Sequence, residues 1–225
     1  LIGILIDQKI FKAADKVCAI LPELNSTAYK EATIRDLLDM RTGVTFVEDY
    51  LATSGLMIDY RKATNWNPLE NNEAPSDLRS FYRLLDKKSH PDGKQFNYVS
   101  PNSDLLGWIV ERSTGERFSD LLSDLFWKPL GATMPSYITV DRLGAPRVAG
   151  GLCTTAIDLA LVGQLFLDYG FTNGRQILPK NWLQDIQENG SRGAWLEGNF
   201  AEYFPDRDMH YRSKWYVDHL SLIHI

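Results

Sequence analysis

Two hydroxyl-bearing residues, Tyr98 and Ser100, lie two positions apart just before an apolar segment, in the stretch QFNYVSPNSDLLGW. Alternate residues of an extended chain point to the same side, and Pro101 favours an extended backbone at Ser100. The two hydroxyls can therefore face one cleft and take part in proton transfer. The same residues also fit a structural role, in which Ser100 caps the following helix, Pro101 occupies its first position and Tyr98 packs as a half-buried aromatic. The local sequence leaves both interpretations open.

Other familiar kinds of reactive site are missing from the sequence. The histidines show neither mutual spacing nor spacing with cysteine or acidic residues that would suggest a shared metal site, so we expect no metal. We interpret His90 and His210 as solvated loop residues. Gly150-Gly151 is a lone glycine pair rather than a phosphate-binding loop, and no G-x-S-x-G elbow of the α/β-hydrolases occurs. The sequence therefore predicts a site without a metal or cofactor.

The composition is that of an ordinary globular protein. Of the 225 residues, 44% are hydrophobic and 24% are charged, which provides enough apolar material for a substantial core. The net charge of −5 and the lack of a run of Lys and Arg argue against a nucleic-acid partner. Cys18 and Cys153 are too few for a disulfide framework; they could pair, but we expect two free thiols. The apolar run LIGILIDQKI is too short to span a bilayer.

Most of the chain is predicted to be helical. Thr33 with Asp36, and Thr155 with Asp158, have the spacing of capping boxes at helix starts, and Ser76 is a further candidate cap. Apolar periodicity extends the helices over 32–43, 76–88, 100–115, 119–131, 154–170 and onward from Pro179. Helix ends are predicted at the breakers Gly43, Gly115, Pro129 and Gly170.

The remaining segments predict loops and one strand. Residues 44–75 lack a sustained period and are rich in Asn, with Pro and Gly, so we expect a long loop that lines or covers a site. Residues 211–217, YRSKWYV, alternate as a strand does, and Asn173-Gly174 indicates a tight turn. No repeat or clear linker interrupts the chain, so residues 1–219 are expected to form a single domain.

Four segments that occur in order at sensible separations carry a family resemblance: TIRDLLDMRTGV, FNYVSPNSDLLGWIVERSTG, FWKPLGA and GGLCTTAIDLALVGQLFLDYG. Together they resemble the serine β-lactamase and penicillin-binding protein superfamily. The match is best with the class C-like branch, which includes esterases and 6-aminohexanoate-dimer hydrolases, and it covers nearly all of residues 1–217. The resemblance implies an α+β, β-lactamase/transpeptidase-like fold. Because the family builds its antiparallel sheet from both chain ends, we expect mainly the helical domain with a depleted sheet.

The resemblance also implies roles for three residues. The family uses a Ser-x-x-Lys, a Tyr-x-Asn or Tyr-x-Ser, and a Lys-Thr-Gly-like strand; its serine attacks an acyl carbon and forms an acyl-enzyme. Tyr98 fills the tyrosine position and Ser100 the third position of that motif, so both are predicted to be catalytic. Tyr50, in FVEDY, resembles a substrate-contacting tyrosine, although packing of a loop aromatic explains it equally well.

No Ser-x-x-Lys occurs in the chain. The resemblance places the nucleophile upstream of Leu1 and the third motif beyond the predicted strand, so we expect a fragment truncated at both ends, with residues 220–225 as a non-native tail. The predicted parent is a serine hydrolase that cleaves a small-molecule amide, ester or lactam, and the chain itself is expected to be inactive. The alternative is a binding or sensing module that keeps the fold without catalysis. The sequence does not reveal the substrate, the oligomeric state or the cellular compartment.

Overall fold

The computed structural model describes residues 1–219, so the expected tail at 220–225 lies outside the described residues. The α-helices are α1 (Ile2–Asp7), α2 (Val17–Ile20), α3 (Ile34–Leu38), α4 (Leu56–Ala63), α5 (Leu78–Phe81), α6 (Ser100–Thr114), α7 (Phe118–Leu122), α8 (Lys128–Leu130), α9 (Ala156–Leu167), α10 (Lys180–Glu188) and α11 (Arg192–Leu196). Shorter 3₁₀ or π segments are η1 (Pro22–Leu24), η2 (Tyr82–Leu84), η3 (Ser123–Trp127) and η4 (Ala201–Tyr203). The strands are β1 (Tyr137–Ile138), β2 (Leu152–Cys153), β3 (Phe171–Thr172), β4 (Arg175–Gln176), β5 (Met209–Arg212) and β6 (Trp215–Asp218).

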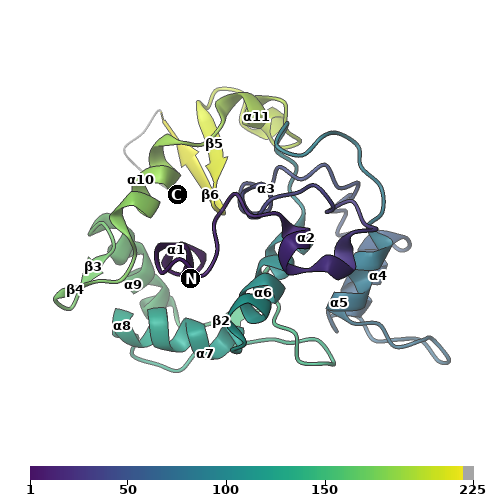
Figure 1. Ribbon diagram of the computed structural model, residues 1–225, viewed down its shortest axis with the longest axis horizontal. Helices are drawn as coiled ribbons and strands as arrows, with labels where there is room; N and C mark the ends of the chain where they lie inside the picture. Colours follow the sequence, from purple (N-terminus) through teal and green to yellow (C-terminus); the bar gives the residue numbers. More distant parts are fainter. Residues whose placement is uncertain (220–225) are drawn as a thin grey trace.

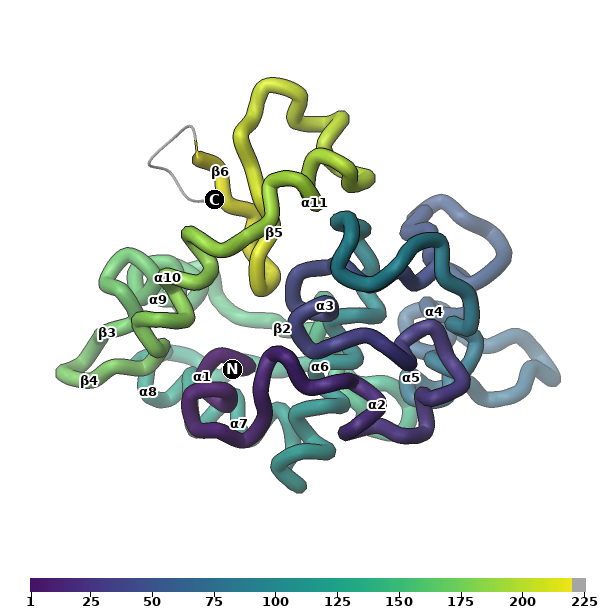
Figure 2. Tube along the Cα trace, turned by 45° about the horizontal axis from the view of Figure 1, so that its top comes forward, coloured from purple at the N-terminus to yellow at the C-terminus, as the bar shows by residue number. Residues whose placement is uncertain are grey.

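The described chain is mainly helical with little sheet, as predicted. Its strands form antiparallel pairs, β1 with β2, β3 with β4 and β5 with β6, and each pair stands alone within residues 1–219. Figures 1 and 2 show α6 running between two lateral groups of elements. One group holds α8, α9, α10 and the β3–β4 hairpin, the other holds α4 and α5, and the β5–β6 hairpin with α11 lies along a third edge. No helix of the described part is long and apolar enough to cross a membrane.

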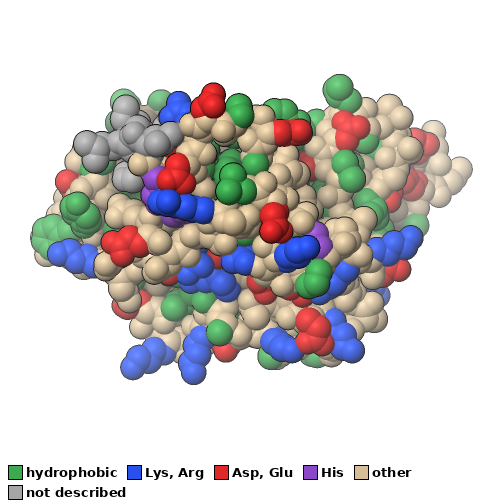
Figure 3. Space-filling view, turned by 90° about the horizontal axis from the view of Figure 1, so that it is seen from above, with side chains coloured by type: hydrophobic (Ala, Val, Ile, Leu, Met, Phe, Trp, Pro, Cys, Tyr) green, Lys and Arg blue, Asp and Glu red, His purple; other side chains and the backbone are tan. Residues whose placement is uncertain are grey.

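Buried side chains form a main core and two smaller clusters. The main core gathers apolar residues from α1 through α7, among them Tyr29, Leu37 and Ile109. A second cluster joins α8, α9 and α10, and a third lies under the β5–β6 hairpin around Phe96 and Trp195. On the outside, acidic and basic side chains are interspersed over the face seen in Figure 3. The fold therefore presents no broad single-sign surface on that face.

Helix α6 is the element that carries the Tyr98–Ser100 segment at its start. The helix ends at Gly115 in the left-handed conformation, with φ of 76°, as the sequence predicts. Its N-cap, however, is Val99 in an extended conformation, and no side chain caps it. The interpretation of Ser100 as the cap is therefore wrong. Ser100 is the first helical residue, and its hydroxyl donates a hydrogen bond to Glu48.

Helix α3 begins as predicted but ends early. The Thr33 hydroxyl accepts a hydrogen bond from the Asp36 N–H at 3.2 Å, and the Asp36 carboxylate accepts one from the Thr33 N–H at 2.9 Å, which completes the capping box. The predicted end at Gly43 is wrong, because the helix stops at Leu38 and the backbone turns left-handed at Met40, with φ of 53°. This early turn directs the Met40 sulfur back toward α6, where Val99 N–H donates to it at 3.5 Å.

The segment predicted as one strand over 211–217 is instead a hairpin. Strands β5 and β6 meet at a two-residue turn, Ser213-Lys214, in which both residues have positive φ, 50° and 73°. That turn type normally uses Asn or Gly, so the sequence gives no warning of it. Two hydrogen bonds fix the turn on the end of α3, from Ser213 N–H to the Asp39 carboxylate at 3.0 Å and from Lys214 N–H to the Leu38 carbonyl at 3.1 Å.

Several further boundaries differ from the sequence prediction. Asp77, not Ser76, caps α5, accepting hydrogen bonds from the Arg79 and Ser80 N–H groups at 3.0 Å. Pro129 lies inside α8, which ends at Gly131 with φ of 80°. Helix α9 stops at Leu167, ahead of the predicted end at Gly170. The predicted loop over 44–75 is interrupted by α4.

Three further predictions concern single side chains. Thr155 caps α9 by accepting the Asp158 N–H at 3.1 Å, as predicted. Cys18 and Cys153 are both free, also as predicted. His210 was expected to be solvated, and this is wrong: it is buried, and its ring nitrogens contact the Ile186 carbonyl at 2.8 Å and the His219 ring at 2.7 Å.

A buried ion pair joins α6 to the elements around it. The Asp104 carboxylate lies 2.7 Å from the Arg147 guanidinium, and both side chains are almost fully shielded from solvent. The Tyr60 hydroxyl of α4 donates to Asp104 at 2.5 Å, and the Ala149 N–H donates to it at 2.8 Å. Burial raises the pKa of the Asp104 carboxyl, whereas the Arg147 charge and these donors oppose that rise. The pair thus ties α6, α4 and the loop before β2 together.

We predict that Asp104→Asn costs about 3–5 kcal/mol of unfolding free energy, because it leaves the Arg147 cation buried without a counter-charge. Urea unfolding measures the change. The surface substitution Asp168→Asn is the matched control and should stay within about 0.5 kcal/mol of the parent chain. A loss of less than about 1 kcal/mol in Asp104→Asn would show that the pair does not hold these elements together.

Candidate active site

The three residues singled out in the sequence line one cavity. Tyr98, Ser100 and Tyr50 all contribute to the walls of a cavity of about 380 Å³, called here the Tyr50 cavity. Tyr98 and Ser100 come from the segment that leads into α6, whereas Tyr50 comes from the loop ahead of α4. Residues that are far apart in the chain therefore lie around one cavity. The sequence predicts this convergence only through the family resemblance.

A fourth residue, Glu48, joins Ser100 to Tyr50. Its carboxylate accepts hydrogen bonds from the Ser100 N–H at 2.7 Å, from the Ser100 hydroxyl, and from the Tyr50 hydroxyl at 2.7 Å. Glu48 was not predicted from the sequence, where its position two residues before Tyr50 in FVEDY was the available signal. The Ser100 side chain is thus engaged by Glu48 rather than by the helix start.

Tyr98 is held by its ring and its backbone. Its ring stacks on Phe200, with centroids 5.4 Å apart and an interplanar angle of 14°, and its N–H donates to the Asn199 side chain at 3.3 Å. Burial raises the pKa of Tyr98, the negative charge of Glu48 raises it further, and interaction with the Ser100 side chain partly offsets the rise. At neutral pH Tyr98 is accordingly a phenol, and a nearby cation would be needed to favour its phenolate.

Tyr50 shares the same negative neighbour but is more open. The residue is 58% exposed, and its partial burial together with the hydrogen bond to Glu48 raises its pKa to about 12. Tyr50 therefore remains protonated and offers a hydroxyl at the rim of the cavity. An exposed aromatic at a cavity rim suits contact with a ligand, and it also fits the packing role that the sequence left open.

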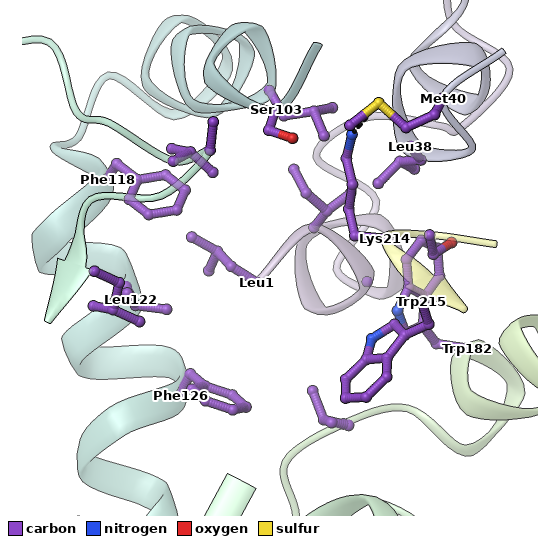
Figure 4. Close-up of a pocket in the computed structure, with 18 of the residues that line it drawn as sticks. Leu1, Leu38, Met40, Ser103, Phe118, Leu122, Phe126, Trp182, Lys214 and Trp215 are labelled. Atoms are coloured by element: carbon purple, nitrogen blue, oxygen red, sulfur yellow. Dashed lines mark hydrogen bonds between the residues drawn. The ribbon is translucent and has the colours of Figure 1, made fainter. Parts of the chain in front are cut away.

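Tyr98 also lines a second, larger cavity. This cavity of about 490 Å³, called here the Lys214 cavity, lies between α1, α6, η3 and the β5–β6 turn and is walled mostly by apolar side chains (Figure 4). Leu1 is one of the wall residues. Tyr98 and Ala149 line both cavities, so they separate the two spaces. A group entering either cavity would meet the Tyr98 side chain.

Lys214 extends from the hairpin turn into this region, toward the Met40 sulfur (Figure 4). Its ammonium donates to the Leu37 carbonyl at 2.8 Å and to the Met40 sulfur at 3.4 Å, and within residues 1–219 it forms no ion pair. Burial lowers its pKa to about 7, although the charges of Asp39, Asp104 and Glu48 oppose the effect. Lys214 is therefore an amine that titrates near neutral pH, and the strand pattern of 211–217 gave no indication of it.

The site contains no cluster of His, Cys, Asp or Glu that could hold a metal ion, as far as residues 1–219 show. The reactive or charged groups that line the two cavities are hydroxyls, the Glu48 carboxylate, the Lys214 amine and the guanidinium groups of Arg61 and Arg147. These groups can move protons and hold a polar substrate. A nucleophilic serine with a lysine three residues on is absent from the whole sequence.

Comparison with known proteins agrees with the family resemblance seen in the sequence. The Beta-lactamase family model matches residues 1–221. The 6-aminohexanoate-dimer hydrolase of Paenarthrobacter ureafaciens is 32% identical over 215 residues, covering 96% of this chain and 54% of the relative. The chain thus spans about half the length of this curated relative.

Solved structures share the fold. The putative 6-aminohexanoate-dimer hydrolase from Bacillus anthracis superposes with a TM-score of 0.80 at 25% identity, covering 96% of this chain and 54% of that one. A putative beta-lactamase from Bacteroides dorei gives a TM-score of 0.60 at 26% identity, covering 83% of this chain and 51% of that one. EstCE1, a hydrolase with promiscuous acyltransferase activity, has a TM-score of 0.66 at 15% identity over 94% of this chain and 64% of its own, which shows the fold alone.

We predict that Glu48→Gln lowers the pKa of Tyr98, because removing the nearby negative charge favours the phenolate. Carbon-13 NMR of chains labelled at tyrosine Cζ measures the titration midpoint, and Tyr98→Phe assigns the signal. Glu116→Gln, at the opposite end of α6, is the control and should leave the midpoint in place. A Tyr98 midpoint that stays or rises in Glu48→Gln would contradict the proposed electrostatic role of Glu48.

Proposed function

The chain belongs to the beta-lactamase family, and on that premise we propose that it is part of a serine hydrolase that cleaves a small-molecule amide, ester or lactam through an acyl-enzyme. The observation that carries the proposal is the convergence of Tyr98, Ser100 and Tyr50 on one cavity around Glu48. Those are the residues that match the family's tyrosine motif and its substrate-contacting tyrosine. The similarity to 6-aminohexanoate-dimer hydrolases supports an amide among the substrates.

In this proposal Tyr98 handles the proton of the reacting groups. A serine hydroxyl is a weak nucleophile until a neighbouring base takes its proton as the oxygen attacks the acyl carbon. Tyr98 is a phenol at neutral pH, so it needs an adjacent cation before it can accept that proton. As the tetrahedral intermediate collapses, the same hydroxyl can donate a proton to the leaving nitrogen or oxygen. The Ser100–Glu48 contact keeps the Tyr98 segment at the cavity wall during these steps.

We further propose that the nucleophile and the activating lysine come from sequence outside this chain, and that the chain alone is inactive. Two observations support this. No Ser-x-x-Lys is present, and Leu1 lines the same Lys214 cavity that Tyr98 faces. A segment joined to Leu1 would consequently begin at the wall of the cavity that Tyr98 also lines. The absence of Ser-x-x-Lys is equally compatible with the alternative, a non-catalytic binding module. The two functions are distinguished by whether Ser-x-x-Lys precedes Leu1 in frame.

Tyr98→Phe tests the proton-transfer role in a longer form of the protein that carries Ser-x-x-Lys ahead of Leu1. The substitution removes one hydroxyl and keeps the ring on Phe200, so the melting temperature should change little. The kcat for an ester or amide should fall by about 10²–10⁴-fold, as expected for loss of a general acid–base group. Ser100→Ala, which removes one contact to Glu48, serves as the comparison and should have a smaller effect on kcat. A stable Tyr98→Phe variant that keeps more than about half of the parent kcat would end the catalytic interpretation.

A further inference from the structure

The charged residues that line the Tyr50 cavity differ in the partners that their charged groups have within the protein. Arg147 is paired with Asp104 at 2.7 Å. Glu48 accepts hydrogen bonds from the Ser100 N–H, the Ser100 hydroxyl and the Tyr50 hydroxyl. Arg61, on α4, forms no ion pair within the described residues; its guanidinium donates only to the Tyr50 backbone carbonyl.

The neighbours of Arg61 complete a surface suited to an anion with an apolar body. Trp66 lines the same cavity, and although the Arg147 guanidinium lies 5.9 Å from its ring centroid, the residue is 69% exposed, so much of its surface is available to a ligand. The N–H groups of Trp66 and Asn67 donate to the Arg61 carbonyl at 2.9 and 3.1 Å, so the backbone after α4 folds back on Arg61 and fixes both residues beside it. Asn67 also lines the cavity and adds an amide donor.

We propose that Arg61, with Trp66 and Asn67, forms a carboxylate-binding subsite, and that the substrate is an amide or ester whose chain ends in a carboxylate. The substrate assignment rests on the proposed function of the cavity; the subsite itself rests on the geometry. A guanidinium presents paired N–H donors that match the two oxygens of a carboxylate. A cavity of about 380 Å³ lies near the lower end of ligand pockets, which suits a small linear chain.

The adjacent cation provides a matched control within the same helix. Lys62 follows Arg61 on α4, but it is paired with Glu73 at 2.7 Å and does not line the Tyr50 cavity. Removing its charge changes the net charge of the chain by the same amount as removing that of Arg61. Any effect specific to Arg61 is therefore due to its place at the cavity and not to long-range electrostatics.

The test is a binding titration on the chain itself, with hexanoate and its neutral analogue hexanamide as probes. Nitrogen-15 NMR of the tryptophan indoles reports binding, and Trp66→Phe assigns the Trp66 signal. We expect hexanoate to shift that signal and to bind about tenfold more tightly than hexanamide, the scale of one charge-assisted contact. Arg61→Gln should abolish the preference, and Lys62→Gln should retain it. Equal binding of both probes by the parent chain, no binding of hexanoate, or equal loss in both variants would overturn the proposal.

Failure of this subsite and failure of the proposed hydrolase give different results. The titration needs no turnover, so it reports on the subsite even in an inactive chain. Hydrolysis of neutral esters by the longer form without any carboxylate preference in the titration would reject the subsite and keep the hydrolase. A carboxylate preference abolished by Arg61→Gln, with no hydrolysis by the longer form, would keep the subsite and reject the hydrolase.

Discussion

The ion pair between Asp104 and Arg147 is the constraint on which the architecture of the site depends. It lies one helical turn beyond Ser100 on α6, and it reaches α4 through Tyr60 and the loop before β2 through Ala149. Burying two charges is costly unless they meet and their remaining hydrogen bonds are made. Here that condition fixes three elements that lie far apart in the sequence. Tyr60, Arg147 and Ala149 are also wall residues of the Tyr50 cavity, so the same contacts that anchor α6 define the space in front of Ser100.

Within that frame Glu48 is the charged residue that acts on Tyr98, although Arg61 and Arg147 also line the Tyr50 cavity. Glu48 organises Tyr50 and Ser100, and its charge adds to the effect of burial in raising the pKa of Tyr98. The amine of Lys214 lies in the neighbouring cavity and is linked to the Tyr98 segment through the Met40 sulfur, which also accepts the Val99 N–H. Because burial lowers the pKa of Lys214 to about 7, only a fraction of the molecules carry a positive charge on Lys214 at neutral pH. A positive group brought in beside Tyr98 is what this arrangement lacks for the chemistry proposed.

The sequence predicts those features that depend on neighbouring residues and misses those that depend on tertiary contacts. The Thr33 capping box and the end of α6 at Gly115 follow from local backbone hydrogen bonding, and both are confirmed. The hairpin turn at Ser213-Lys214 could not be predicted, because it is stabilised by Asp39 and Leu38 from a distant helix rather than by turn-forming residue types. For the site, the resemblance predicted Tyr98, Ser100 and Tyr50, whose functional roles remain proposals. Glu48 and Lys214 were missed because only folding brings a carboxylate from one loop and an amine from the hairpin to the same helix start.

We propose that this chain holds the proton-handling half of a serine hydrolase whose nucleophile lies outside it. Labelling with a fluorophosphonate probe, with the adduct mapped by mass spectrometry, tests this most directly. The account predicts that the purified chain stays unlabelled, whereas a longer form with Ser-x-x-Lys ahead of Leu1 is labelled at that serine. Stoichiometric labelling of any serine in the purified chain, or a longer form that hydrolyses esters without becoming labelled at that position, would contradict it.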